Sequence, residues 1–282
     1  MRDSEVGPEE ALLSAEIPRG WMRLTRIGGP TVLIEFDGWR ILSDPTFDPP
    51  GRRYGFGLGA SSVKTAGPAV PREHLGRLDA VLVSHDHHAD NLDDLGREML
   101  VDTPVVLTTH AGRRRLGGEN IIGLSAWENT TLARQDGARL EITATPCRHG
   151  PPFSRALVGD VIGFALRRPG EVRTALWVSG DTVKFRGTDQ VAARLDIDVA
   201  IIHLGAVRFP ATGRLTYSLD ARRAMRVLER IDPRVALPVH YEGWSHFSEP
   251  ESHMLEAVEA SPARHLIQWL PLGEPTLVRA RG

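Results

Sequence analysis

The sequence is poor in cysteine, since its 282 residues include one, Cys147. A single cysteine excludes an internal disulfide framework and a cluster of thiolate ligands, so a metal site here would have to use histidine and carboxylate side chains. Long apolar runs are lacking too, because none approaches the roughly 18 residues of a membrane-spanning helix. We therefore expect no stable insertion into a membrane.

The sequence also lacks an excess of charge of either sign. Its 34 basic and 36 acidic side chains give a formal net charge of −2 at pH 7. Domains that bind nucleic acids usually carry a basic surface. We therefore expect a small-molecule substrate and no nucleic-acid partner, and the sequence leaves open whether the protein forms a homo-oligomer.

The length favours one large domain, because single α/β folds commonly reach about 250 residues. Residues 1–20 are acidic and hold only a short apolar stretch, so we interpret them as a leader segment without a secretory signal. Residues 21–282 would then form one folded domain, and we expect a cytoplasmic protein.

Stretches rich in predicted strands and stretches rich in predicted helices each occur twice along the chain. Short apolar runs predict strands at 22–27, 31–36, 39–42, 80–83, 104–108, 130–134, 139–145, 161–167, 173–179, 199–204 and 235–239. Helices are predicted at 92–100, 218–231 and 251–260. Two sheets packed face to face with helices outside, an α/β (α+β) sandwich of four layers, would satisfy this order. The glycine- and proline-rich stretch 48–62 is expected to be a long ordered loop or lid.

The densest chemical signal is the segment SHDHHADNLDD, which begins at Ser84 directly after a predicted strand. His85 and His87 are one residue apart, so a short turn can direct both imidazoles at one point, and Asp90 adds a carboxylate. Imidazole and carboxylate groups suit zinc, and also iron or manganese. The alternative is a solvated turn in which Asp90 or Asn91 caps the following helix.

Three more candidate ligands each follow a predicted strand. They are His149, Asp181 and His240. The ends of neighbouring strands lie along one edge of a layered fold, so these groups can converge although they are far apart in sequence.

Taken together, these motifs resemble the metallo-β-lactamase-fold hydrolases. The resemblance lies in the HxH motif followed by Asp90, in TPCRHG, in VSGDT and in PVHYEGW. The motifs LSDPTF and SHDHHADNLD are most similar to the branch that contains L-ascorbate-6-phosphate lactonase and N-acylphosphatidylethanolamine phospholipase D. The resemblance extends from about residue 21 to the C-terminus.

The resemblance implies an αββα sandwich with two metal ions, Zn²⁺ or else Mn²⁺ or Fe²⁺, at the edge of the two sheets. The implied ligands are His85, His87 and His149 on the first metal, Asp181 as the bridge, and Asp90 and His240 on the second metal.

The chain departs from the family motif HxHxDH at one point. Two residues, His88 and Ala89, separate His87 from Asp90, and Asn91 stands in place of the last histidine. Either one residue is inserted, which aligns Asp90 with the family aspartate, or none is, which aligns Ala89 with it. We favour the insertion because DNLD then parallels the family's DHLD. The second metal site is expected to be the weaker one, and His88 could also turn toward the metals.

The resemblance implies a metal-dependent hydrolase, in which a metal-bound hydroxide attacks a small ester, lactone or phosphoester. Asp90 and His246 are the candidate catalytic residues, Asp90 for orienting the hydroxide and His246 for assisting the leaving group. His246 lies between aromatic residues and could instead serve packing. The alternatives are a mono-iron redox enzyme of the sulfur dioxygenase type and a phosphodiesterase or nuclease.

Three further residues are open to two interpretations each. Asp44 either fixes a ligand histidine or forms a turn after its strand, and His203 is expected to line the floor of the pocket more than to bind metal. Arg148 either orients an anionic substrate or belongs to a charged surface.

Overall fold

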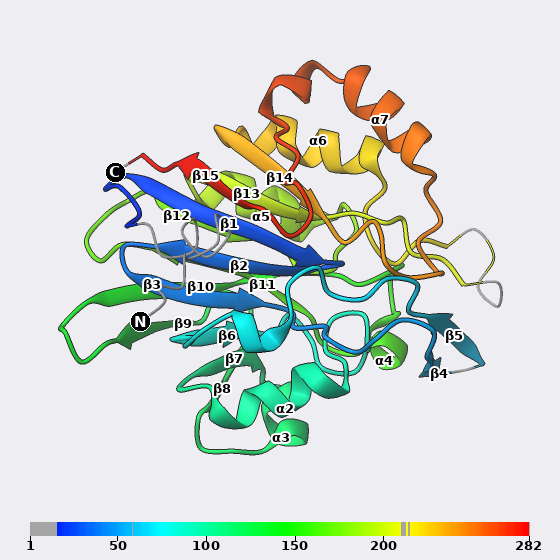
Figure 1. The fold of residues 1–282 in the computed structure, drawn as a ribbon. Coiled ribbons are helices and arrows are strands. Elements are labelled where there is room, and N and C mark those ends of the chain that lie inside the picture. Colours follow the sequence, from blue (N-terminus) through cyan, green and yellow to red (C-terminus); the bar gives the residue numbers. More distant parts are fainter. Residues whose placement is uncertain (1–15, 58, 210–212, 214, 282) are drawn as a thin grey trace, which may run out of the picture.

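Two β-sheets lie face to face in the middle of the computed structural model, which describes residues 16–57, 59–209, 213 and 215–281 (Figure 1). The seven-stranded sheet has the order β15-β1-β2-β3-β6-β7-β8. Its strands are β1 (Trp21–Gly28), β2 (Thr31–Phe36), β3 (Trp39–Ser43), β6 (Ala80–Leu82), β7 (Val106–Thr109), β8 (Ile121–Leu124) and β15 (Pro275–Arg279). The larger part of the expected leader, residues 1–15, lies outside the described residues.

The second sheet has six strands in the order β14-β13-β12-β11-β10-β9. Its strands are β9 (Asn129–Ala133), β10 (Arg139–Pro146), β11 (Ile162–Arg167), β12 (Thr174–Val178), β13 (Ile197–His203) and β14 (Val235–Val239). Strands β12, β13 and β14 are parallel, and β10 runs in the same direction because β11 is antiparallel to both β10 and β12. The chain therefore leaves these four strands at the same edge of the sheet.

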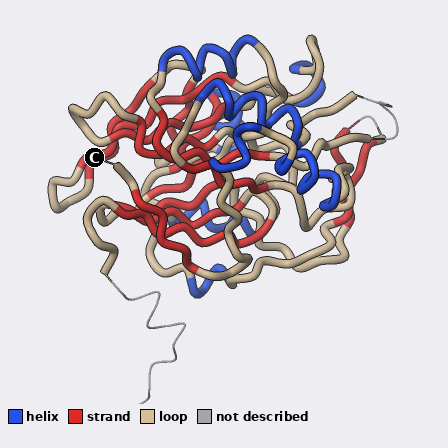
Figure 2. Tube along the Cα trace, turned by 90° about the horizontal axis from the view of Figure 1, so that it is seen from above, coloured by secondary structure: helices blue, strands red, loops and turns tan. Residues whose placement is uncertain are grey.

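Helices cover the outer faces of both sheets. The seven-stranded sheet packs against α2 (Asp94–Asp102) and α3 (His110–Leu116), and the six-stranded sheet packs against α5 (Arg186–Arg194), α6 (Ala221–Ile231) and α7 (Glu251–Glu259). The shorter elements are α4 (Arg155–Val158), η1 (Arg72–His74) and η3 (Pro262–Leu266). Figure 2 shows strands inside and helices outside, which confirms the expected αββα order. Among the described residues, no helix is both long and apolar enough to cross a bilayer.

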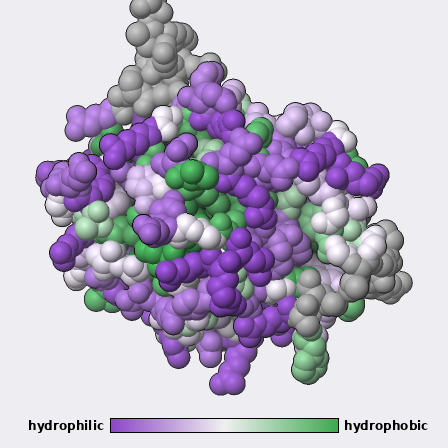
Figure 3. Space-filling model, turned by 90° about the horizontal axis from the view of Figure 1, so that it is seen from below, coloured by the Kyte–Doolittle hydropathy of each residue, from purple (hydrophilic) through white to green (hydrophobic). Residues whose placement is uncertain are grey.

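Among the described residues, three of the four apolar clusters lie between the layers. The largest joins the inner faces of the two sheets, for example Ile34 of β2 and Ile142 of β10, both 0% exposed. The other two lie under the helices, where Leu228 of α6 and Leu100 of α2 are buried. Hydrophilic side chains predominate on the face seen from below, with one apolar area near its middle (Figure 3).

Local sequence signals explain several element boundaries. Asp37 and Gly38 join β2 to β3 with φ values of 50° and 78°, the left-handed conformations that a tight hairpin turn requires. Helix α6 begins later than the predicted residue 218, because Asp220 caps it by accepting a hydrogen bond from the backbone N–H of Arg223 at 2.7 Å.

The stretch 48–62, in which residue 58 lies outside the described residues, was expected to be a long loop or lid, but its described part includes a hairpin of β4 (Arg53–Gly57) and β5 (Ala60–Val63). Buried ion pairing fixes the base of this hairpin, because Lys64 Nζ lies 2.8 Å from Asp93 Oδ2. Asp93 also caps α2 by accepting from the N–H of Gly96 at 2.9 Å. The hairpin is therefore attached to the start of α2, beside the segment that carries the histidine motif.

Candidate metal centre

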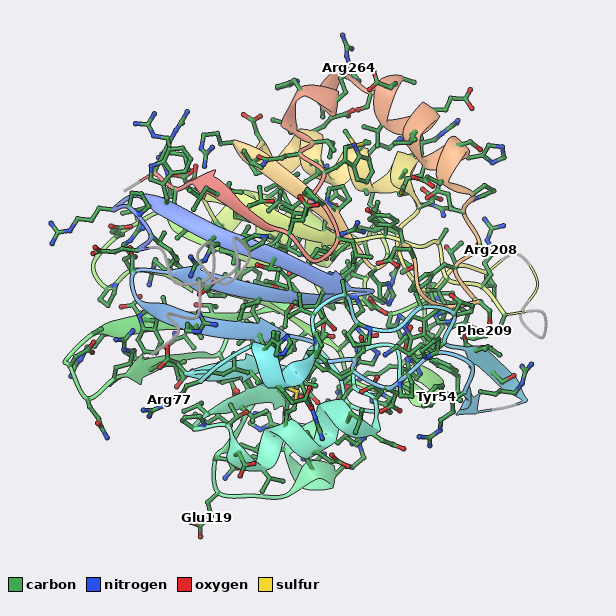
Figure 4. The ribbon with its side chains drawn as sticks, viewed as in Figure 1. Tyr54, Arg77, Glu119, Arg208, Phe209 and Arg264 are labelled. Carbon is green, nitrogen blue, oxygen red and sulfur yellow. The ribbon has the colours of Figure 1, made fainter. Side chains whose placement is uncertain are left out.

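Buried histidine and aspartate side chains converge where strands of both sheets end. Figure 4 labels Tyr54 and Phe209 at this end, beside the β4–β5 hairpin. The segment between β6 and α2 supplies three of the six clustered side chains, and the segments after β10, β12 and β14 supply one each. These six side chains belong to His85, His88, Asp90, His149, Asp181 and His240.

The first cluster consists of three imidazoles. The Nδ1 atom of His88 lies 3.1 Å from Nε2 of His85 and 3.1 Å from Nε2 of His149. Nδ1 of His149 donates to the carbonyl oxygen of Tyr217 at 2.7 Å, so Nε2 of a neutral His149 carries a lone pair directed at the cluster. At most one proton fits between each pair of these nitrogen atoms, whereas one cation could accept a lone pair from each.

Burial keeps these imidazoles neutral. Loss of solvent, and then the neighbouring imidazoles, hold the pKa values of His85 and His88 well below the usual range. Burial also lowers the pKa of His149. The neutral imidazole is the form that coordinates a metal ion.

The second cluster consists of Asp90, Asp181 and His240. Nε2 of His240 lies 3.3 Å from Oδ2 of Asp90, and its Nδ1 lies 3.3 Å from Oδ1 of Asp181. Burial alone would lower the pKa of His240, but the two carboxylates outweigh burial and raise it to about 9. His240 also has a φ of 60°, a strained backbone conformation of the kind found at functional sites.

Three of the four carboxylate oxygens in the second cluster form no hydrogen bond among the described residues. Both carboxylate oxygens of Asp181 and Oδ1 of Asp90 are buried without a hydrogen bond. Buried carboxylate oxygens without partners are costly, and a divalent cation would satisfy them. The neutral imidazoles of the first cluster and the carboxylates of the second are donors that zinc, iron and manganese accept, and a cation would replace the proton that the carboxylates favour on His240, so the residues present fit a metal centre.

His87, which the resemblance implies as a ligand of the first metal, belongs to neither cluster, although its ring centroid lies 5.4 Å from that of His85 and 5.2 Å from that of His88. Its Nδ1 lies 3.3 Å from Nη2 of Arg115, and its Nε2 faces Gly159, where an added Cβ would be only 1.5 Å away. His88 joins the first cluster in its place. The sequence placed the motif in a turn after its strand, and β6 does end at Leu82, but the conformation of this turn directs His85 and His88 at one point instead of His85 and His87.

Asn91 is buried beside the clusters but belongs to neither. Its Nδ2 donates to Oγ of Ser84 at 3.4 Å, and its Oδ1 has no hydrogen-bond partner in the described part of the chain. The position where the family motif has a histidine therefore holds a neutral amide.

His246 lies against Asp90 and is buried among aromatic rings. Its Nε2 is 2.9 Å from Oδ2 of Asp90, and its Nδ1 is 2.5 Å from Oγ of Ser62. Its ring stacks on Phe209 with centroids 5.6 Å apart and an interplanar angle of 15°. Sequence reasoning missed Ser62, because only the folded β4–β5 hairpin brings that hydroxyl to His246.

Asp44 and His203 support the clusters from outside. Oδ1 of Asp44 accepts from the backbone N–H of Ser84 at 2.6 Å, and its Oδ2 lies 3.4 Å from Nε2 of His203. Burial raises the pKa of Asp44. Asp44 thus positions the backbone just before His85. Among the described residues it forms no hydrogen bond or ion pair with a clustered histidine, and His203 lies outside both clusters.

Known proteins resemble the chain over most of its length. A UPF0173 metal-dependent hydrolase of Carboxydothermus hydrogenoformans is 24% identical over 232 residues, which cover 79% of this chain and 86% of that protein. The crystal structure of isothiocyanate hydrolase from Delia radicum gut bacteria superposes with a TM-score of 0.74 at 21% identity, over 92% of this chain and 100% of that chain. Igni18, a metallo hydrolase from Ignicoccus hospitalis, superposes with a TM-score of 0.63 at 20% identity, over 92% of this chain and 98% of that chain.

The model of a β-lactamase superfamily domain matches residues 39–241, a span that includes both clusters. The two solved structures share the fold at low identity, and the relative from C. hydrogenoformans is named a metal-dependent hydrolase. Since the match covers more than half of the sequence, the chain belongs to the metallo-β-lactamase superfamily.

Proposed function

We propose that the protein is a metal-dependent hydrolase of small esters, lactones or phosphoesters, with zinc as the first choice of metal. The observation that carries this proposal is the pair of buried clusters, in which three of the four carboxylate oxygens lack a hydrogen bond among the described residues. In this proposal the first metal is held by His85, His88 and His149, and the second by Asp90, Asp181 and His240.

A divalent cation bound by such donors would lower the pKa of a coordinated water molecule toward about 7 and would polarise the oxygen under attack. The protein's own groups then orient the reactants. Nε2 of His246 donates to Oδ2 of Asp90, which leaves Oδ1 of Asp90 free for the metal or the attacking water. Although burial opposes it, the charge of His246 and the contact with His240 hold the pKa of Asp90 well below its usual range, so Asp90 stays ionised.

Aromatic side chains around the clusters support an organic substrate. Phe56 lies 5.0 Å from the ring of His88, and Phe247 lies 4.6 Å from that of His240, centroid to centroid. Small-molecule sites are typically apolar walls with a few polar groups. This wall, together with the net charge of −2, disfavours a nuclease. The resemblance to the lactonase and phospholipase D branch supports lactones and phosphoesters.

Metal removal tests the proposal directly. The purified protein should hydrolyse at least one compound in a panel of chromogenic lactones, esters and phosphodiesters. Treatment with a chelator should abolish this activity, and added Zn²⁺ or Mn²⁺ should restore it. Hydrolysis that survives complete removal of metal would contradict the proposal.

His246 offers a test of how Asp90 is oriented. Replacing His246 with glutamine should lower kcat by about 100-fold, because Asp90 loses the group that holds its Oδ2. Ser62→Ala should lower kcat in the same direction by about 10-fold. Metal content should stay at the wild-type value in both variants. His253→Gln, which replaces an exposed histidine of α7, is the matched control. Full activity of His246→Gln would rule out this role.

An iron-dependent redox enzyme is the second candidate, because the three imidazoles of the first cluster also suit iron. Elemental analysis combined with an oxygen electrode separates the two. Iron together with thiol-dependent oxygen consumption would favour the redox enzyme, whereas zinc or manganese with hydrolysis would favour the hydrolase.

A further inference from the structure

A cavity of about 430 Å³ lies beside the first cluster. His149 forms part of its wall, together with the ends of β7 and β8 and the segment from β10 to β11. The polar residues that line the cavity include Thr109, Ser125 and Arg148. Its volume lies within the range of roughly 300–1,000 Å³ that is usual for small-molecule sites.

Arg148 supplies a positive charge to this wall that no carboxylate neutralises in the described part of the chain. Its Nε is buried and has no hydrogen-bond partner. Arg155 lines the same cavity, but it pairs with Asp160 and its side chain is 81% exposed. Arg148 therefore differs from Arg155 in having a buried, unused donor.

Packing holds the guanidinium of Arg148 in place before any ligand binds. Its Cζ lies 5.0 Å from the ring centroid of Phe185, a cation–π contact. The backbone on either side is also fixed, because the N–H of Arg148 donates to Oγ1 of Thr182 at 3.1 Å and its carbonyl accepts from the N–H of Val183 at 2.9 Å. A donor group that is already positioned loses little entropy when it binds.

Arg148 directly precedes His149, so its positive charge lies next to the first cluster in sequence. Arg148 and His149 are consecutive, so their Cα atoms are ~3.8 Å apart, and both residues line the cavity. A small molecule can therefore contact both residues at once. The planar guanidinium matches the two oxygens of a carboxylate or phosphate group, with which it forms paired hydrogen bonds.

We propose that this cavity binds an anionic group of the substrate, a carboxylate or a phosphate, and that Arg148 determines the preference for it. The proposal rests on the proposed function, since it assigns the anionic group to the compound that is hydrolysed. Hydrolysis occurs at the clusters, and the anionic group remains in the cavity.

Matched esters test this preference. The 4-nitrophenyl monoester of glutaric acid carries a free carboxylate, and 4-nitrophenyl pentanoate is its neutral counterpart. Wild-type protein should have the higher kcat/KM with the anionic ester. Arg148→Gln should lower kcat/KM for the anionic ester by about 30-fold, the loss expected for a charged hydrogen-bonded pair. The same substitution should change kcat/KM for the neutral ester by less than about threefold. Arg148→Lys keeps the charge but loses the paired hydrogen bonds of the guanidinium. Its kcat/KM for the anionic ester should lie between those of wild type and Arg148→Gln.

Arg186→Gln is the control, because Arg186 is exposed, follows Phe185 directly and does not line the cavity. It should leave both esters unaffected. Thermal unfolding of each variant reports whether the fold is retained. An Arg148→Gln protein that is folded and keeps the wild-type preference for the anionic ester would overturn the proposal.

Direct binding separates this proposal from the hydrolase function. Calorimetric titration with glutarate, and separately with inorganic phosphate, is carried out on the protein as purified and after chelation. Binding that persists after chelation and weakens by about 30-fold in Arg148→Gln supports the anion site, even if no ester is hydrolysed. The stronger of the two ligands identifies the anionic group. Equal binding by wild type and Arg148→Gln, or no binding by either, would overturn the anion site whatever the hydrolysis assays show.

Discussion

Replacement of Asp181 with asparagine is expected to abolish hydrolysis and leave the fold intact. Asp181 is 0% exposed, and both its carboxylate oxygens lack a hydrogen-bond partner among the described residues. An amide carries no charge to hold a cation. Since metal ions contribute several kcal/mol to stabilising the transition state, kcat/KM should fall on the order of 1,000-fold or more.

Stability measurements distinguish this effect from unfolding. After chelation, Asp181→Asn should unfold at a temperature close to that of wild type, because the variant loses a buried carboxylate without hydrogen bonds but also loses its ion pair with His240. Added metal should raise the unfolding temperature of wild type by mass action and that of Asp181→Asn much less. Asp232→Asn, at an exposed position with a φ of 51° that asparagine tolerates, serves as the control. Wild-type turnover by Asp181→Asn would contradict the assignment.

His88→Ala and His87→Ala should differ sharply in activity. Nδ1 of His88 lies 3.1 Å from the nitrogen atoms of both His85 and His149, whereas His87 contacts Arg115 and lies outside both clusters. His88→Ala should lose bound metal and lower kcat/KM on the order of 1,000-fold. His87→Ala should keep its metal and lower kcat/KM by less than about 10-fold, below the 10- to 100-fold that is typical when a group supporting a metal ligand is lost, because His87 belongs to neither cluster.

The two variants are measured together, by metal content and by kcat/KM on the same substrate. The reverse result, with His87→Ala inactive and His88→Ala active, would favour the HxH spacing that the sequence suggested. It would mean that the turn between β6 and α2 differs from the conformation described above.

The sequence was sufficient to predict the four layers, because most strands are continuous apolar runs and a DG turn joins β2 to β3. It did not predict α5, whose buried residues Gly187, Thr188 and Val191 include little apolar surface, so no helical stripe is visible. It also missed β15, where Val278 is one of few buried side chains. These elements depend on packing against the sheets more than on local pattern.

The candidate site was predictable where a strand delivers the side chain. His149, Asp181 and His240 each follow a strand whose end is evident in the sequence, and the structure brings all three to the two clusters. The choice between His87 and His88 was not predictable, because it depends on the dihedral angles of a turn. The contact between Ser62 and His246 joins residues 184 positions apart, and it depends on the β4–β5 hairpin, which the sequence did not predict.

The central claim is that the two clusters bind metal ions, and anomalous scattering from crystals grown with Zn²⁺ tests it most directly. The claim predicts one peak about 2.0–2.1 Å from Nε2 of His85, Nδ1 of His88 and Nε2 of His149, and a second peak among Asp90, Asp181 and His240. A metal-loaded crystal without density at either cluster, or with zinc on His87 in place of His88, would contradict it.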